Sequence, residues 1–180
     1  MICGMKNTYS GFIAIIGPTN AGKSTLVNQI MGRKVSIISH KVQTTRTRLR
    51  AIKMVGDRQL IFVDTPGVFV PKRRLDRAMV GAAMSAMDDA DAVLLLVDAQ
   101  KGITQTVRDL CEKIKNHKNL FVALNKVDSV EKTTLLPMVA ELSQLAHAAQ
   151  AVSLHSGGGV LSHKETIFII GVRHGKGTLR

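Results

Sequence analysis

The chain has 180 residues, 45% of them hydrophobic, so it is long enough to bury the core of one domain. It has one tyrosine and no tryptophan, and its two cysteines, Cys3 and Cys111, are too few for a disulfide framework. No apolar run approaches the roughly 20 residues of a membrane span. These features exclude a disulfide-rich secreted domain and a membrane-spanning protein. They predict a cytoplasmic protein with an aliphatic core and two reduced thiols.

The charge is strongly positive, with 25 lysines and arginines against 13 acidic residues and a formal net charge of +12. A basic surface attracts polyanions such as nucleic acid, and it also attracts the acidic headgroups of membrane lipids. A generally soluble basic protein is an equally good interpretation of charge alone. Because only 3% of residues are aromatic, an RNA partner is expected to be contacted mainly at its phosphates.

The first predicted elements are a buried strand, Phe12–Ile16, and a helix, Ser24–Met31, on either side of a glycine-rich loop. The loop matches the pattern G-x-x-x-x-G-K-[ST], and its backbone N–H groups and the helix N-terminus favour a bound anion. We expect Lys23 to reach the β- and γ-phosphates and the Ser24 hydroxyl to ligate Mg²⁺. A glycine turn without ligand is the weaker alternative. The predicted nucleotide-contacting residues are Gly17, Pro18, Thr19, Asn20, Ala21, Gly22, Lys23, Ser24 and Thr25.

A hairpin is predicted next, because the strand-like runs Arg48–Val55 and Gln59–Val63 flank Gly56-Asp57. The second strand ends in Asp64-Thr65-Pro66-Gly67. A carboxylate at a strand end beside a phosphate loop can hold Mg²⁺ through water, and the Gly67 amide can meet a γ-phosphate. Such a turn is common by itself, but after a phosphate loop it is strong evidence for a nucleotide site.

Strand and helix patterns alternate through the rest of the chain, which predicts an α/β fold with a doubly wound, mostly parallel sheet. The hairpin supplies the one expected antiparallel strand. The remaining predicted strands are Ala92–Asp98, Leu120–Leu124 and Thr166–Ile170, and the predicted helices are Arg77–Met87, Thr106–Asn116 and Thr133–Ala149.

The run Asn125-Lys126-Val127-Asp128 follows a predicted strand and indicates which base is bound. The Asp128 carboxylate can accept two hydrogen bonds, which match the adjacent N1–H and 2-amino donors of guanine. Adenine has no donors there, so a site of this kind discriminates by on the order of 10⁴ or more. Asn125 can face the other edge of the base, and the Lys126 stem can pack over the ring. A polar helix cap is the weaker interpretation, and guanine specificity is the firmest functional prediction.

With these three motifs in order, residues 10–130 resemble the Era family of ribosome-associated GTPases, in the TrmE–Era group of translation-factor-class GTPases. The stretches Val35-Ser36-Ile37-Ile38-Ser39 and Gln43-Thr44-Thr45-Arg46 carry the resemblance further. It implies a P-loop NTPase fold, a Ras-like G domain, and hydrolysis of GTP to GDP and phosphate as a molecular switch. It also implies a role in small ribosomal subunit assembly, in contact with rRNA. The implied catalytic residues are Lys23, Thr44, Thr45, Asp64 and Gly67.

The resemblance also bears on metal ions. It places the threonine that completes the Mg²⁺ shell at Thr44 or Thr45, beside the ligands Ser24 and Asp64. Val68 stands where Ras-like enzymes carry the glutamine that orients water, so slow intrinsic hydrolysis is expected. Asn20 stands where relatives bind K⁺, which would neutralise transition-state charge. A loop-shaping hydrogen bond is the equal alternative for Asn20.

The chain departs from the family pattern near its C-terminus. The best match to the loop that closes the guanine pocket is Ile170-Gly171-Val172, without the family's Ser-Ala pair, and the amides of Gly171 and Val172 are expected to bind the guanine carbonyl. The family's RNA-binding KH domain is absent, so residues 1–180 are expected to form an incomplete G domain. Alternatives are a non-catalytic nucleotide- or RNA-binding remnant, or a GTPase of the same group in large-subunit assembly or tRNA modification. The implied location is cytoplasmic, with peripheral membrane contact as a further possibility.

Overall fold

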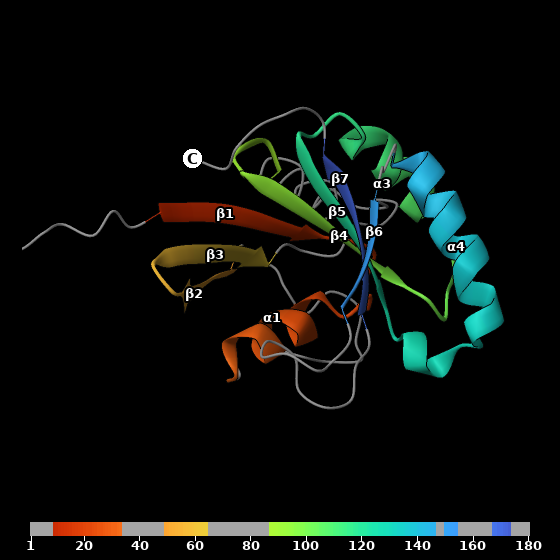
Figure 1. Ribbon diagram of the computed structural model, residues 1–180, viewed down its shortest axis with the longest axis horizontal. Coiled ribbons are helices and arrows are strands. Elements are labelled where there is room, and N and C mark those ends of the chain that lie inside the picture. Colours follow the sequence, from red (N-terminus) through yellow and green to blue (C-terminus); the bar gives the residue numbers. More distant parts are fainter. Residues whose placement is uncertain (1–8, 34–48, 65–86, 147–149, 155–166, 174–180) are drawn as a thin grey trace, which may run out of the picture.

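The computed structural model describes residues 9–33, 49–64, 87–146, 150–154 and 167–173. These residues form a seven-stranded sheet in the order β2-β3-β1-β4-β5-β7-β6 (Figure 1). Among the described residues, no helix is long and apolar enough to cross a membrane. The strands are β1 Tyr9–Ile16, β2 Leu49–Val55, β3 Arg58–Asp64, β4 Ala92–Asp98, β5 Asn119–Asn125, β6 Gln150–Leu154 and β7 Ile167–Arg173.

The centre of the sheet is parallel, because β1 pairs with β3 and β4, and β4 pairs with β5, all in the same direction. The predicted hairpin is confirmed: β2 and β3 are antiparallel. Gly56 in its turn has φ 63°, a conformation that glycine adopts without steric cost. The predicted α/β class with a mostly parallel sheet is therefore confirmed.

The C-terminal strands correct the prediction of a single antiparallel strand. Strand β6 is absent from the predicted elements, because the hydrophobic pattern weakens from Gln150 onward. The structure pairs β7 antiparallel with β5, and β6 antiparallel with β7. Two strands, β2 and β7, thus run against the others. The sequence pattern predicts a strand near Ile167 but contains nothing that sets its direction, which depends on the partner strand it meets.

Three α-helices are described, α1 Lys23–Met31, α3 Gln105–Ile114 and α4 Lys132–Leu145, together with a short 3₁₀ helix, η1 Val127–Ser129. Gly32 caps the C-terminus of α1, where its φ of 67° allows its N–H to donate to the Gln29 carbonyl at 3.0 Å. Thr104 caps the N-terminus of α3, where its side chain accepts a hydrogen bond from the Val107 amide. The predicted helix Arg77–Met87 lies almost entirely outside the described residues.

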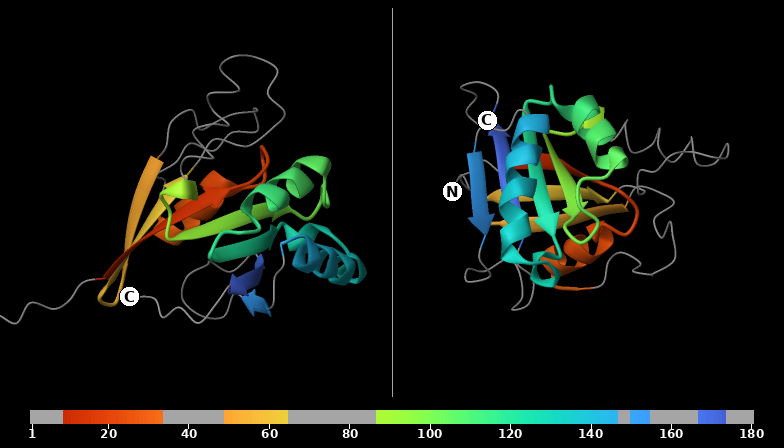
Figure 2. Two further views of the ribbon diagram at one scale, coloured as in Figure 1. Left: turned by 90° about the horizontal axis from the view of Figure 1, so that it is seen from above. Right: turned by 90° about the vertical axis from the view of Figure 1, so that its right-hand side faces the viewer.

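The two faces of the sheet are covered differently, with α1 on one face and α3 and α4 on the other (Figures 1 and 2). Successive residues of a strand point to opposite faces. On β4, Leu96 accordingly packs with α1, whereas its neighbours Leu95 and Val97 pack with α3 and α4. A strand buried on both faces is continuously apolar, which explains the unbroken run at β4.

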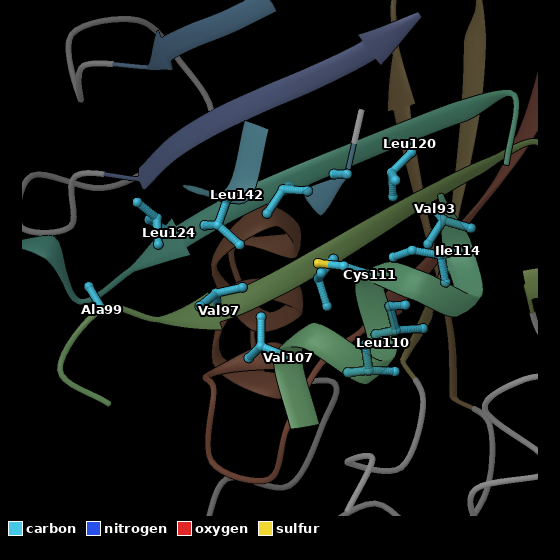
Figure 3. Packing of buried hydrophobic residues seen from close by; sticks show 14 of the residues in the cluster. Val93, Val97, Ala99, Val107, Leu110, Cys111, Ile114, Leu120, Leu124 and Leu142 are labelled. Carbon is cyan, nitrogen blue, oxygen red and sulfur yellow. The ribbon is translucent and has the colours of Figure 1, made fainter. Parts of the chain in front are cut away.

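The larger cluster, between the sheet and the α3–α4 pair, is aliphatic (Figure 3). Cys111 is buried within it, and the loss of solvation raises the pKa of its thiol to about 11. A thiol held in its protonated form behaves as a small apolar side chain. Arg108 of α3 forms an ion pair with Glu141 of α4 at the surface of this layer.

Helix α4 offers a test of the large cluster with a matched control. Leu142 is fully buried, whereas Leu136 on the same helix is 75% exposed. We expect Leu142→Ala to lower the free energy of unfolding by about 2–5 kcal/mol, because it removes buried methyl groups and leaves a cavity. Leu136→Ala should change it by about 0.5 kcal/mol or less. Urea unfolding followed by circular dichroism measures both, and equal effects would contradict this packing.

Candidate nucleotide-binding site

The glycine-rich loop connects the carboxyl end of β1 to the first turn of α1, as predicted. Gly17 and Gly22 both have positive φ, at 151° and 98°. A Cβ at Gly17 would lie 2.3 Å from the Leu96 carbonyl oxygen, and a Cβ at Gly22 would lie 2.2 Å from Nδ2 of Asn125. The glycines are therefore required by close approach to β4 and to the end of β5, as well as by backbone conformation.

The lysine of the loop points back over the loop itself. Lys23 Nζ donates to the carbonyl oxygens of Gly17 and Pro18, at 3.1 and 2.9 Å. Lys23 and Ser24 are both buried at the start of α1. Burying a charged or polar group is costly unless it is hydrogen-bonded, and here the loop carbonyls supply partners for the ammonium. The arrangement concentrates a positive charge and a hydroxyl where a helix N-terminus already favours anions.

The predicted base-reading motif lies against this loop, although about a hundred residues separate the two in the chain. Asn125, buried at the end of β5, donates from Nδ2 to the Ala21 carbonyl at 2.9 Å. Its Oδ1 accepts a hydrogen bond from the Lys126 amide at 2.9 Å. Asn125 thus connects the phosphate loop to the start of the base-reading motif.

Lys126 makes a second connection between the same two segments. Its Nζ donates to the Asn20 carbonyl at 3.2 Å and to Oδ2 of Asp98 at 2.6 Å. Both Lys126 and Asn20 have left-handed backbone conformations, with φ of 60° and 61°, which residues other than glycine rarely adopt.

Asp98 is a site residue that the sequence reasoning missed. It is the last residue of β4, only 3% exposed, and its Oδ1 accepts a hydrogen bond from the Gln100 amide at 3.0 Å. The available signal was a carboxylate at the end of an apolar strand in a predicted parallel sheet. Ligands of such sheets bind outside the carboxyl ends of the strands.

Asp128 lies in η1, after the left-handed turn at Lys126. Its side chain is exposed, and its Oδ2 accepts a hydrogen bond from the Ser129 hydroxyl at 3.2 Å. An ionised carboxylate has about four lone-pair positions, so it retains acceptor capacity for two further donors. The geometry is compatible with the predicted role in reading guanine.

For two other predicted site residues, the structure gives a position in a strand or helix, and five more lie outside its described part. Asp64 ends β3 and pairs with Ile15 of β1, which brings it to the edge of the sheet that carries the loop. Thr25 is the third residue of α1. Five predicted residues lie outside the described part of the chain: Thr44, Thr45, Thr65, Pro66 and Gly67.

The register of β7 does not support the predicted role of Gly171 and Val172. They pair with Phe121 and Leu120, near the start of β5, whereas Asn125 at its other end contacts the phosphate loop. Gly171 is four strand positions from Asn125, roughly 13 Å at about 3.3 Å per residue. The antiparallel direction of β7 carries this segment away from Asn125, so the described backbone does not support the expectation that it closes the guanine pocket, which stays a prediction.

Comparisons with known proteins agree with this geometry. The family described as 50S ribosome-binding GTPase matches residues 12–126. Over 138 residues the chain is 51% identical to GTPase Era of Rhizobium meliloti (strain 1021), a match that covers 76% of this chain and 44% of the relative. The chain spans about half the length of the curated relatives it matches.

Solved structures show the same similarity. Era in complex with MgGDPNP and nucleotides 1506–1542 of 16S ribosomal RNA superposes with a TM-score of 0.69 at 35% identity, covering 77% of this chain and 48% of that one. NFeoB from S. thermophilus bound to GDP.AlF4⁻ and K⁺ superposes with a TM-score of 0.53 at 25% identity, covering 66% and 45%. The predicted resemblance to Era is confirmed. Since the family match covers more than half of its residues, the chain belongs to the family of 50S ribosome-binding GTPases.

Proposed function

We propose that the chain binds GTP and hydrolyses it to GDP and phosphate as a molecular switch. The observation that carries the proposal is the pair of contacts that join the phosphate loop to the base-reading motif, Asn125 to Ala21 and Lys126 to Asn20. A nucleotide has its base at one end and its phosphates at the other. A site that binds both needs the two recognition segments at a fixed separation, which these contacts provide.

Lys23 and the loop amides are proposed to bind the β- and γ-phosphates. Their charge and dipoles are aligned before the reaction, so stabilising the negative charge of phosphoryl transfer needs little reorganisation. The loop backbone from Gly17 to Gly22 would follow the phosphate chain, with the hydroxyl groups of Ser24 and Thr25 at its end. The further contacts proposed for Thr44, Thr45, Thr65, Pro66 and Gly67 concern residues outside the described part of the chain.

The residues near the loop also fit Mg²⁺. Ser24 is the second residue of α1, and Asp64 ends β3, the strand next to β1, so a hydroxyl and a carboxylate come from neighbouring elements. Magnesium prefers oxygen ligands and is usually bound by one or two side chains together with substrate phosphates and waters. When bound, the ion would supply neutralisation of phosphate charge. Ser24 and Asp64 would hold it, with Thr44 or Thr45 completing the set.

A role in assembly of the small ribosomal subunit is proposed from similarity. The related Era structure contains a segment of 16S ribosomal RNA, and this chain carries a net charge of +12, which attracts nucleic acid. Such a role places the protein in the cytoplasm. The same charge would also favour contact with acidic lipid at the membrane surface.

Guanine specificity is tested at Asp128. We expect Asp128→Asn to lower GTP affinity by about 100-fold or more. The amide keeps one acceptor oxygen but loses the charge, and its NH₂ group faces one of the two guanine donors, so one charge-assisted hydrogen bond worth about 1.5–3 kcal/mol is lost and a donor is left unpaired. The preference of the variant should shift towards xanthosine nucleotides. Xanthine has a carbonyl where guanine has its amino group, so it needs a hydrogen-bond donor from the protein. Calorimetric titration with both nucleotides measures the change.

The control for this substitution is Asp109→Asn, which removes the same charge from the exposed face of α3 and should leave GTP binding unchanged. Equal GTP affinity in wild type and Asp128→Asn would show that Asp128 does not read the base.

The two glycines that flank α1 test how the loop is held. Gly22→Ala should abolish tight GDP binding, because its Cβ would meet Asn125 and displace the contact that joins the two segments. Gly32→Ala, at the other end of the helix, has similar positive φ but nothing within 4 Å. It should cost about 1–2 kcal/mol of stability from backbone strain and leave GDP affinity unchanged. Equilibrium titration with a fluorescent GDP derivative and thermal melts separate the two effects, and similar GDP affinities in the two variants would argue against this loop geometry.

Hydrolysis is tested by a multiple-turnover phosphate-release assay with GTP in matched KCl and NaCl solutions. We expect several phosphates per protein molecule, released faster in K⁺ than in Na⁺. The exposed Asn20 side chain lies on the loop, and the related NFeoB structure contains K⁺ together with GDP.AlF4⁻. Asn20→Ala should remove the difference between the two salts.

The expected hydrolysis of GTP and its expected acceleration by K⁺ can be contradicted separately. Absence of phosphate release in either salt would contradict the proposed enzyme activity. Equal rates in K⁺ and Na⁺ would leave the hydrolysis intact and exclude Asn20 as a potassium ligand.

A further inference from the structure

We propose that Asp98 is a positioning residue that holds Lys126 over the phosphate loop and thereby sets how long a guanine nucleotide stays bound. The inference rests on the proposed function, because it concerns the same nucleotide site. Asp98 lies at the carboxyl end of β4, paired with Asn125 at the end of β5. It therefore belongs to the same edge of the sheet as the base-reading motif, although it is outside that motif in sequence.

The Asp98 carboxylate is buried and fixed on both of its oxygens. Oδ1 accepts the Gln100 amide at 3.0 Å, and Oδ2 accepts Lys126 Nζ at 2.6 Å. The Asp98 side chain is 3% exposed, whereas that of Lys126 is 35% exposed. A buried carboxylate is stable only when it is paired and hydrogen-bonded, so its charge is directed to the lysine rather than to solvent.

Lys126 forms a bridge between this carboxylate and the loop. The same ammonium donates to the Asn20 carbonyl, and the Lys126 backbone is left-handed at φ 60°. With its head held at two points, the four-carbon stem of Lys126 is ordered before a base arrives. A free lysine side chain would have to be ordered during binding, which weakens affinity. Asp98 thus supplies preorganisation of the wall on which guanine is proposed to pack.

A purely structural role is the competing explanation. The turn after β4 is also held by the Lys101 amide, which donates to the Asp98 carbonyl at 3.1 Å, and by the Ala99 amide, which donates to the Asn125 carbonyl at 2.9 Å. These are backbone interactions that a side-chain substitution preserves. Asp98→Asn keeps an oxygen that can accept from Gln100 and removes the charge that attracts Lys126. It therefore separates the two roles.

The test is the release rate of a fluorescent GDP derivative from the full chain, measured by stopped-flow displacement with excess GDP. We expect Asp98→Asn to release it about 10-fold faster, since one flexible side chain must then be ordered at each binding event. Lys126→Met should accelerate release to a similar extent. In the Lys126→Met background, Asp98→Asn should add nothing.

The matched control is Asp88→Asn, an exposed residue before the start of β4, which should release the derivative at the wild-type rate. Asp98→Ser is a second variant, with a hydroxyl for the Gln100 amide and no charge, and it should behave like Asp98→Asn. Thermal melts accompany every variant.

Two results would overturn the inference alone: an Asp98→Asn release rate equal to wild type, or a full additional acceleration in the Lys126→Met background. Failure of both Asp98 variants to fold would assign the residue a structural role and also overturn it. A wild-type chain that retains no guanine nucleotide would instead overturn the proposed function, and the inference with it.

Discussion

The amide side chain of Asn125 holds the phosphate loop against the end of β5, and much of the site depends on this contact. Its Nδ2 donates to the Ala21 carbonyl and lies so close to Gly22 that no Cβ fits between them. The hydrogen bond is buried, where competition from water is weak and an unpaired partner would be costly. One short polar side chain therefore sets the distance between the two segments proposed to bind the ends of the nucleotide.

The parallel sheet makes this contact available. Because β1, β4 and β5 run in the same direction, their carboxyl ends meet at one edge, and the loop, Asp98 and Asn125 emerge together. The apolar residues on both faces of β4 and β5 hold these ends in place, packed by α1 on one side and by α3 and α4 on the other. The polar site is thus carried on a rigid aliphatic layer, which suits a site that must hold its geometry before ligand arrives.

Positive charge at the site is balanced in two different ways. Lys23 is buried and directed to loop carbonyls, whereas Lys126 pairs with the buried carboxylate of Asp98 and reaches the loop from the other side. Carbonyl dipoles leave the net charge of Lys23 intact, which favours a phosphate. An ion pair neutralises the head of Lys126, and the proposed role of its stem is therefore to contact the base rather than the phosphates. The proposed roles of the two lysines differ because their partners differ in charge.

The local sequence determined the elements that depend on short-range physics. The glycine spacing, the apolar strand before it and the amphipathic helix after it identify the phosphate loop, and Gly56-Asp57 identifies the hairpin, because these signals arise from neighbouring residues. The proposed role of Asp128 could be inferred from sequence, since a carboxylate can accept hydrogen bonds from the two adjacent donors of guanine. Only the tertiary structure decided which residues meet across the sheet. The pairing of Asp98 with Lys126 depends on the register of β4 and β5, and the displacement of Gly171 and Val172 from the site depends on the direction of β7. Register and strand direction are long-range properties, set by which strands pack together, and no local pattern in the chain encodes them.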